Sequence, residues 1–175
     1  MALNIVLIEP EIPQNTGNII RTAMAINATL HLIKPLGFSL DEKSLKRAGM
    51  DYINDVDLEV YENVEEFFLK NKDVDVYYVT RYASKPHSSF DLSDITHDYY
   101  FMFGKESSGI PHDLLRGHMD KLMRIPMSFN ARSLNLSNSV AIVTYEACRQ
   151  QNYFNLSTFE TIKGEDFLES EIKND

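Results

Sequence analysis

The sequence lacks the features of a secreted or membrane-bound protein. Cys148 is the only cysteine among the 175 residues, so no disulfide can form within the chain and a reducing compartment fits best. No stretch approaches the roughly 20 apolar residues of a membrane-spanning helix. The first residues lack the basic region and the long apolar run of a secretory signal. We therefore expect a cytoplasmic protein that has no membrane partner.

Several motifs of common enzyme classes are also absent. Gly104 and Gly109 have the glycine spacing of a phosphate-binding P-loop, but Ile110 and Pro111 occupy the positions of its lysine and its hydroxyl residue. No G-x-G-x-x-G dinucleotide motif follows a predicted strand, and no G-x-S-x-G nucleophile elbow is present. The five histidines and Cys148 show no metal-ligand spacing, so we expect no metal.

Positive charge is scarce, since the formal net charge is −9. This balance argues against an RNA partner, because neutralisation of phosphates supplies much of the affinity for RNA. The acidic residues are, however, concentrated in residues 51–75 and 160–175, and the rest of the chain has a small positive balance. An acidic back and a more basic face are compatible with RNA binding, although solvated helix faces are the simpler explanation of each acidic stretch alone.

Strands and helices alternate along the chain. Runs of β-branched and apolar residues predict strands at 3–8, 30–33, 56–61, 74–80, 99–103 and 122–125. Helices are predicted from a cap at Asn15 or Thr16 to Ile26, and at 41–49, 64–69, 111–117 and 136–151, whereas Pro10 and Pro13 are expected to prevent regular structure. This alternation predicts an α/β domain with a largely parallel sheet. We expect this domain to span residues 1–155 and an acidic, helical tail to span 156–175.

A polar loop follows each of three predicted strands. The loop sequences are PQNTGNIIR (13–21), GKESSGIP (104–111) and PMSFNARSLNLSN (126–138). The carboxyl ends of parallel strands meet at one edge of a sheet, and ligands bind at that edge. The sequence therefore predicts one site built from three distant loops.

The three loops resemble, in the same order, the three motifs of the SPOUT class of RNA methyltransferases. The stretches that carry the resemblance are LNIVLIEPEIPQNTGNIIR, KSLKRAGMDY, FMFGKESSGIP and RIPMSFNARSLNLSNSVAIVTYEACRQ. Within this class the chain is similar to the group that methylates the ribose 2′-hydroxyl of the wobble nucleotide, a cytidine or modified uridine at position 34 of transfer RNA. The resemblance implies a deep trefoil knot, a homodimer, and S-adenosylmethionine as the methyl donor with S-adenosylhomocysteine as product.

The resemblance also implies a set of cofactor-binding residues. Gly104 and Gly109 would let the backbone approach the adenosine closely, and apolar side chains would contact the adenine. Packing in the core is an equally good explanation of Ile125 and Leu134. The implied residues are Val79, Thr80, Gly104, Gly109, Ile125, Met127, Ser133, Leu134 and Asn135.

The implied catalytic residues are Arg21, Glu106, Ser133, Asn135 and Tyr145. A guanidinium stays protonated, so we expect Arg21 to orient the 2′-hydroxyl and to stabilise the charge that develops on its oxygen. A salt bridge at the surface or at an interface is the alternative. Glu106 is expected to orient Arg21 or to receive RNA. For Tyr145 the alternative is a core tyrosine with its hydroxyl at the rim.

The implied RNA contacts are Asn15, Asn18, Lys43, Lys46, Arg47, Arg132 and Arg149. For Asn15, capping of the first helix is an equally good explanation. One minimal domain offers little surface for RNA, so we expect a composite site across two subunits. Two other hypotheses remain: the same chemistry at another tRNA position or on ribosomal RNA, and a module that binds cofactor or RNA without catalysis.

Overall fold

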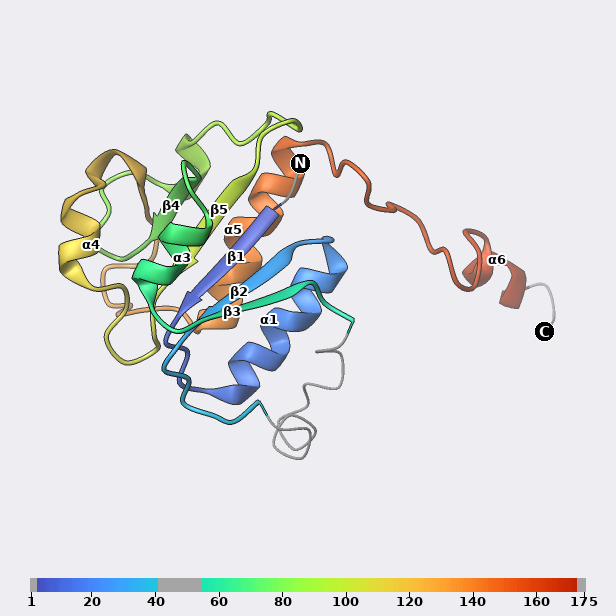
Figure 1. The fold of residues 1–175 in the computed structure, drawn as a ribbon. Helices are drawn as coiled ribbons and strands as arrows, with labels where there is room; N and C mark the ends of the chain where they lie inside the picture. The colour runs from blue at the N-terminus through green and yellow to red at the C-terminus, as the bar shows by residue number, and fades with distance from the viewer. Residues whose placement is uncertain (1–2, 41–54, 173–175) are drawn as a thin grey trace.

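The computed structural model describes residues 3–40 and 55–172 and contains one parallel sheet (Figure 1). Its strands lie in the order β3-β2-β1-β5-β4-β6, and every neighbouring pair is parallel. The predictions of an α/β fold and of a parallel sheet are confirmed. The strands are β1 (Leu3–Ile8), β2 (Thr29–Ile33), β3 (Leu58–Tyr61), β4 (Asp75–Val79), β5 (Tyr99–Phe103) and β6 (Leu122–Met123).

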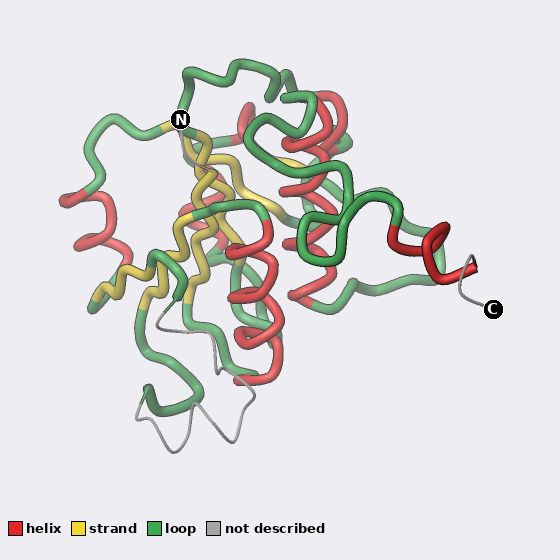
Figure 2. Tube along the Cα trace, turned by 90° about the vertical axis from the view of Figure 1, so that its right-hand side faces the viewer, coloured by secondary structure: helices red, strands yellow, loops and turns green. Residues whose placement is uncertain are grey.

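Helices cover both faces of the sheet (Figures 1 and 2). Leu3, Ile5 and Leu7 of β1 belong to a core with α1 and α5, whereas Val6 and Ile8 belong to a second core with α3 and α4. This alternation follows from the two-residue period of a strand, and each buried aliphatic side chain stabilises the fold by roughly 1.5–3 kcal/mol. The helices are α1 (Pro13–Ala25), α3 (Val64–Lys70), α4 (His112–Arg116), α5 (Leu136–Gln150) and α6 (Phe167–Ile172), with 3₁₀ turns at His87–Ser89 and Met119–Lys121.

The order of the strands places a topological switch point between β1 and β5. From β1 the chain moves outward to β2 and β3, then crosses to β4, and β5 returns to pair with β1. Leu7 is paired with Phe103, so the loops that follow β1 and β5 begin side by side. In parallel α/β sheets such a point forms a crevice in which ligands bind.

Helix α1 begins earlier than the sequence predicts. Its first residue is Pro13, whose fixed φ suits the first helical position and whose missing N–H has no helical partner there. The prediction that Pro13 prevents regular structure is therefore wrong. Ile12 is the N-cap, so the predicted caps at Asn15 and Thr16 are wrong as well. Asn15 lies inside the helix, is buried, and is available for a different role.

The C-terminal tail runs away from the domain (Figure 1) and is less helical than expected. Only Phe167–Ile172 form a helix, and residues 156–166 do not. Gly164 has a φ of 96°, a left-handed conformation that interrupts a helix. The helix predicted at 41–49 lies outside the described residues. No helix in the described ranges is long and apolar enough to cross a membrane.

Candidate functional site

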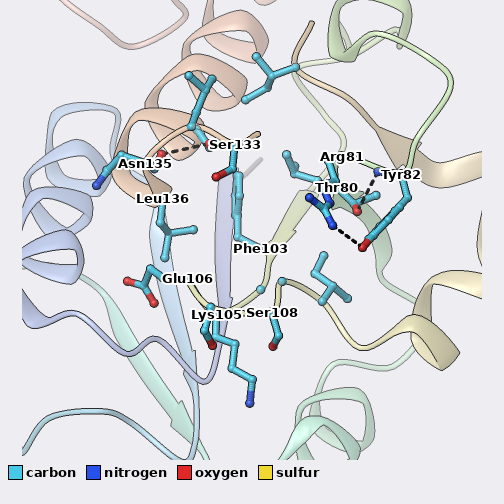
Figure 3. A pocket seen from close by; sticks show the side chains of 18 of the residues that line it. Thr80, Arg81, Tyr82, Phe103, Lys105, Glu106, Ser108, Ser133, Asn135 and Leu136 are labelled. Atoms are coloured by element: carbon cyan, nitrogen blue, oxygen red, sulfur yellow. Dashed lines mark hydrogen bonds between the residues drawn. The ribbon is translucent and has the colours of Figure 1, made fainter. Parts of the chain in front are cut away.

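A cavity of about 630 Å³ opens at the carboxyl ends of β1, β4 and β5 (Figure 3). Its walls come from the three polar loops and from the turn that follows β4. The structure thus brings together segments that lie more than 100 residues apart in the chain. All nine predicted cofactor-binding residues line it: Val79, Thr80, Gly104, Gly109, Ile125, Met127, Ser133, Leu134 and Asn135.

The loop after β5 is a tight turn that requires two glycines. The Gly109 N–H donates to the carbonyl of Lys105 at 2.8 Å. A Cβ on Gly104 would lie 1.9 Å from the carbonyl carbon of Gly109, so the two parts of the loop cross without room for a side chain. Gly109 has a φ of 75°, and a Cβ there would meet nothing within 4 Å. Gly104 is therefore needed for the crossing of the loop, and Gly109 for its left-handed backbone.

A chain of hydrogen bonds connects the three polar segments, the first of which is the start of α1 rather than a loop. The Glu106 carboxylate accepts from the N–H of Glu11 and from Asn15 Nδ2, both at 2.8 Å. Asn15 Oδ1 in turn accepts from Asn135 Nδ2 at 2.9 Å. Asn135 Oδ1 accepts from the N–H of Ser137 at 2.9 Å and so caps α5. This Glu106–Asn15–Asn135 network fixes the position of each loop relative to the others.

A second set of contacts joins the loop after β1 to the loop after β5. Glu11 accepts hydrogen bonds from the hydroxyl and from the N–H of Ser107, both at 2.8 Å. These bonds hold the pKa of Glu11 below its ordinary value, and the bond from the Ser107 hydroxyl contributes most. Lys105 Nζ lies 2.6 Å from Glu9 Oε2, and the hydrogen bond to Glu9 raises the pKa of Lys105. We call these contacts the acidic clasp.

The apolar part of the wall bears on whether Ile125 and Leu134 contact a ligand or pack in the core. Leu134 is 38% exposed and faces the cavity, so core packing is the wrong explanation for it. Ile125 both lines the cavity and packs against the core below α5, and each explanation describes one part of its surroundings. Together with Met127 these side chains offer an apolar surface to a flat ligand.

Five predicted site residues do not line the cavity. Arg21 and Asn18 are exposed on the outer side of α1, and Arg132 is exposed in the loop before α5. Tyr145 and Arg149 are exposed on the outer side of α5. Glu106 accepts a hydrogen bond from Asn15 of its own subunit. Lys43, Lys46 and Arg47 lie outside the described residues.

Tyr145 and Arg149 occupy surroundings that the sequence did not predict. Tyr145 is 44% exposed and borders a second hollow of about 500 Å³ with Ala25, so it is not a core tyrosine. Arg149 donates two hydrogen bonds to the Glu146 carboxylate, at 2.8 and 2.9 Å. That contact is the main reason why the pKa of Glu146 is lowered to about 2.

The cavity also contains residues that the sequence-based site omitted. Arg81, Tyr82 and His112 line the cavity. Figure 3 shows Arg81 and Tyr82 on the wall opposite Ser133 and Asn135. Arg81 and Tyr82 could have been found from the sequence only by their position, because they follow β4 as the polar segments follow their strands. Among the described residues no group of three or more His, Cys, Asp or Glu side chains is placed to hold a metal ion.

Comparison with known proteins identifies the family of the chain. Residues 2–145 match the family described as SpoU rRNA Methylase. This match covers well over half of the chain, and the chain therefore belongs to the SpoU methylase family.

Individual relatives are similar over nearly their whole length. The chain is 53% identical over 156 residues to a Bacillus subtilis (strain 168) protein with the name "Putative tRNA (cytidine(34)-2'-O)-methyltransferase", covering 89% of this chain and 98% of that one. It is 43% identical to the tRNA (cytidine(34)-2'-O)-methyltransferase of Methylovorus glucosotrophus (strain SIP3-4), covering 86% and 96%. A solved structure described as "Structural insights into the 2-OH methylation of C/U34 on tRNA" has a TM-score of 0.78 at 38% identity, covering 87% and 97%.

Proposed function

We propose that this protein methylates the ribose 2′-hydroxyl of the wobble nucleotide of transfer RNA, a cytidine or modified uridine at position 34. The methyl donor is S-adenosylmethionine, and S-adenosylhomocysteine is the product. The observation that carries the proposal is the convergence of the three family loops on one cavity, connected by the Glu106–Asn15–Asn135 network. The names of relatives that match over nearly their full length support the same substrate.

The cavity fits the proposed cofactor. Its volume lies within the range of roughly 300–1,000 Å³ that is typical of small-molecule sites. Ile125, Met127 and Leu134 suit the adenine, while Ser133 and Asn135 offer polar groups next to it. S-adenosylmethionine supplies an electrophilic methyl group when it is bound. The chain's own contribution is to hold the reacting groups in one geometry, which lowers the barrier by orientation.

Arg21 requires a second copy of the chain in order to act. It is exposed on α1 and does not line the cavity of its own subunit. We propose a homodimer in which the outer sides of α1 and α5 meet and the partner's Arg21 reaches the cavity. Ile142 and Tyr145, 39% and 44% exposed on α5, supply apolar surface for this contact. Arg21 then orients the 2′-hydroxyl and stabilises its developing negative charge.

The remaining assignments rest on the family resemblance. Ser133, Asn135 and Glu106 are proposed as the polar catalytic residues that line the cavity, and Tyr145 as an active-site tyrosine. The proposed RNA contacts stay as predicted: Asn15, Asn18, Lys43, Lys46, Arg47, Arg132 and Arg149. The exposed positions of Asn18, Arg132 and Arg149 are compatible with this role. We also propose a catalytic domain at residues 1–155, an additional tail at 156–175, and a cytoplasmic location.

A deep trefoil knot is proposed at the carboxyl end of the sheet. The loop between β4 and β5 contacts the C-terminal part of the chain on both sides of residues 125–135. On one side the His87 N–H donates to the carbonyl of Arg124 at 2.8 Å. On the other side Gln150 Nε2 donates to the carbonyl of Phe90 at 3.1 Å, and Gln151 Nε2 donates to that of Leu92 at 2.9 Å. These contacts support a segment that passes through that loop.

The function is tested with labelled cofactor and total tRNA, followed by mapping of the methylated ribose. We expect label on the 2′-oxygen of nucleotide 34. Transcripts with a deoxyribose at that position should accept no methyl group. Undiminished labelling of such transcripts would reject the wobble assignment, and label in another tRNA position or in ribosomal RNA would identify the substrate instead.

The composite site is tested by mixing two inactive variants. Arg21→Ala should abolish transfer but keep cofactor binding, and Leu134→Glu should block the cavity of its own subunit. Mixed dimers contain one intact site, with Arg21 from one subunit and the cavity from the other. We expect the mixture to regain activity that neither parent shows. Near-normal turnover of Arg21→Ala, or no recovery in the mixture, would contradict the composite site.

A further inference from the structure

The turn that follows β4 is held rigidly against β6. The N–H of Thr80 donates to the carbonyl of Met123 at 2.9 Å, and the N–H of Tyr82 donates to Thr80 Oγ1 at 3.3 Å. The N–H of Arg124 donates to the carbonyl of Lys85 at 2.9 Å, and the Arg124 guanidinium donates to the carbonyl of Arg81. The backbone that carries Arg81 is therefore fixed on both sides of the turn.

Arg81 and Tyr82 form one polar unit on the cavity wall. Arg81 Nη2 donates to the Tyr82 hydroxyl at 2.9 Å, and the guanidinium carbon lies 4.9 Å from the centre of the Tyr82 ring. The Tyr82 ring meets the edge of His112 with 5.0 Å between the ring centres. Figure 3 shows Arg81 and Tyr82 hydrogen-bonded to each other on one side of the cavity. Ser133 and Asn135 lie on the other side.

Among the described charged residues of the cavity wall, Arg81 is the cation available to bind an anion. Among the described residues the formally charged side chains of the wall are Arg81, Lys105 and Glu106. Lys105 is paired with Glu9, and Glu106 accepts from Asn15 and from the backbone. Within the same part of the chain Arg81 forms no ion pair. Its planar guanidinium has donors in the geometry that a carboxylate accepts.

We propose that Arg81, held by the Tyr82 hydroxyl, binds the α-carboxylate of the S-adenosylmethionine tail. This assignment rests on the proposed function, because it requires that cofactor in the cavity. Ile125 and Leu134 would hold the adenine, which leaves the opposite wall for the amino-acid tail. Arg81 is thus a cofactor-binding residue contributed by the same subunit, distinct in place and role from Arg21.

Two probes that differ only in the tail test this assignment. S-adenosylhomocysteine carries the carboxylate, whereas 5′-methylthioadenosine keeps the adenosine and the thioether but lacks the amino acid. We expect Arg81→Gln to weaken the binding of S-adenosylhomocysteine about tenfold or more in calorimetric titration. The affinity for 5′-methylthioadenosine should be unchanged. Tyr82→Phe should produce a smaller loss, again for S-adenosylhomocysteine alone. Arg116→Gln is the matched control, since Arg116 is an exposed α4 arginine paired with Asp113.

Each other outcome is decisive. Equal losses for both probes, or S-adenosylhomocysteine affinity of Arg81→Gln within twofold of wild type, would overturn the assignment while leaving the proposed function intact. A higher KM for tRNA with unchanged S-adenosylhomocysteine affinity would assign Arg81 to an RNA phosphate instead. If the wild-type protein binds neither probe, the proposed function fails and this assignment fails with it.

Discussion

Two clusters of polar side chains in this molecule contain similar residue types but have different surroundings. The first is centred on His31, which is 2% exposed beneath α3 and contacts Tyr61 Oη at 2.9 Å and Asn4 Oδ1 at 3.1 Å. The Tyr61 hydroxyl donates to Glu59 at 2.6 Å. The second is the Glu106–Asn15–Asn135 network, which borders the cavity.

The difference between the clusters lies in position rather than in chemistry. The His31 cluster connects strands β1, β2 and β3 in the interior of the sheet, and none of its residues lines the cavity. The Glu106 network lies where β1 and β5 end, at the switch point of the sheet. A carboxylate or a histidine therefore indicates a site only when the topology places it at an open sheet edge. We expect damage to the first cluster to lower stability and damage to the second to lower activity.

Among changes to the two clusters, Glu106→Ala should have the largest effect on activity. The change removes the acceptor for Asn15 and for the backbone of Glu11, so the segments around the cavity are no longer held in position relative to one another. Methyl transfer should fall about a hundredfold, because small misplacements of reacting groups are costly. Steady-state kinetics with tRNA measures the loss. Glu106→Gln keeps one acceptor oxygen and should lose less, whereas turnover of Glu106→Ala within threefold of wild type would break the comparison.

His31→Phe should produce the opposite pattern. Phenylalanine fills the volume but leaves polar atoms of Tyr61 and Asn4 buried without this partner. The free energy of unfolding should fall by about 3 kcal/mol, and methyl transfer at 25 °C should be unchanged. Urea denaturation and kinetics on the same sample measure both quantities. His118→Phe is the control, since that ring is partly exposed and stacks on Tyr78. A turnover defect in His31→Phe alone would mean that the buried cluster serves the site.

Acid should destabilise the protein through the His31 cluster. Burial lowers the pKa of His31 below its ordinary value of 6.5, outweighing the nearby Glu59 and Asp57 that raise it. The folded state then binds fewer protons than the unfolded state, so stability is full above pH 6.5 and declines below it. The slope reaches about 1.4 kcal/mol per pH unit at most. Unfolding free energies between pH 7 and 5 measure the slope, and His31→Phe should lack this part of it.

The smallest effect is expected for Thr16→Val, beside the cavity network. Thr16 Oγ1 is buried, and in the described part of the chain it has no hydrogen-bond partner. Valine has the same shape without the hydroxyl, so stability should rise by about 1 kcal/mol. Thr144→Val is the matched control, because Thr144 is equally buried but donates to the carbonyl of Val140 at 2.9 Å. Thermal unfolding compares the two variants, and a loss of stability in Thr16→Val would refute the prediction.

The sequence predicted the strands and their parallel pairing but not their order in the sheet. Each strand is a local run of apolar residues, such as Leu3–Ile8, so six residues contain enough information to identify it. The order β3-β2-β1-β5-β4-β6 depends instead on which faces pack together over the whole chain. Local capping rules also failed at α1, where Asn15 hydrogen-bonds across 91 residues to Glu106 rather than to the start of its own helix.

The site was predictable where its residues belong to a recognisable loop. Ser133 and Asn135 lie in such a loop, and the structure places both at the cavity. Arg81 and Tyr82 lie in a stretch without period or motif, and their direction depends on the nonlocal hydrogen bond from Arg124. The outward position of Arg21 follows from the helical period only once the start of α1 is known. Side chains positioned by distant backbone are the part that a single sequence does not reveal.

The acidic clasp couples the cavity to the integrity of the sheet. Glu9 and Glu11 contact Lys105 and Ser107, which are 96 residues away in the chain, so these contacts exist only when β1 and β5 are already paired. A molecule bound between the loops therefore selects the fully assembled sheet over any partly unfolded form. At a hundred times its dissociation constant it adds about 2.7 kcal/mol to global stability, which makes the melting temperature a direct reporter of occupancy.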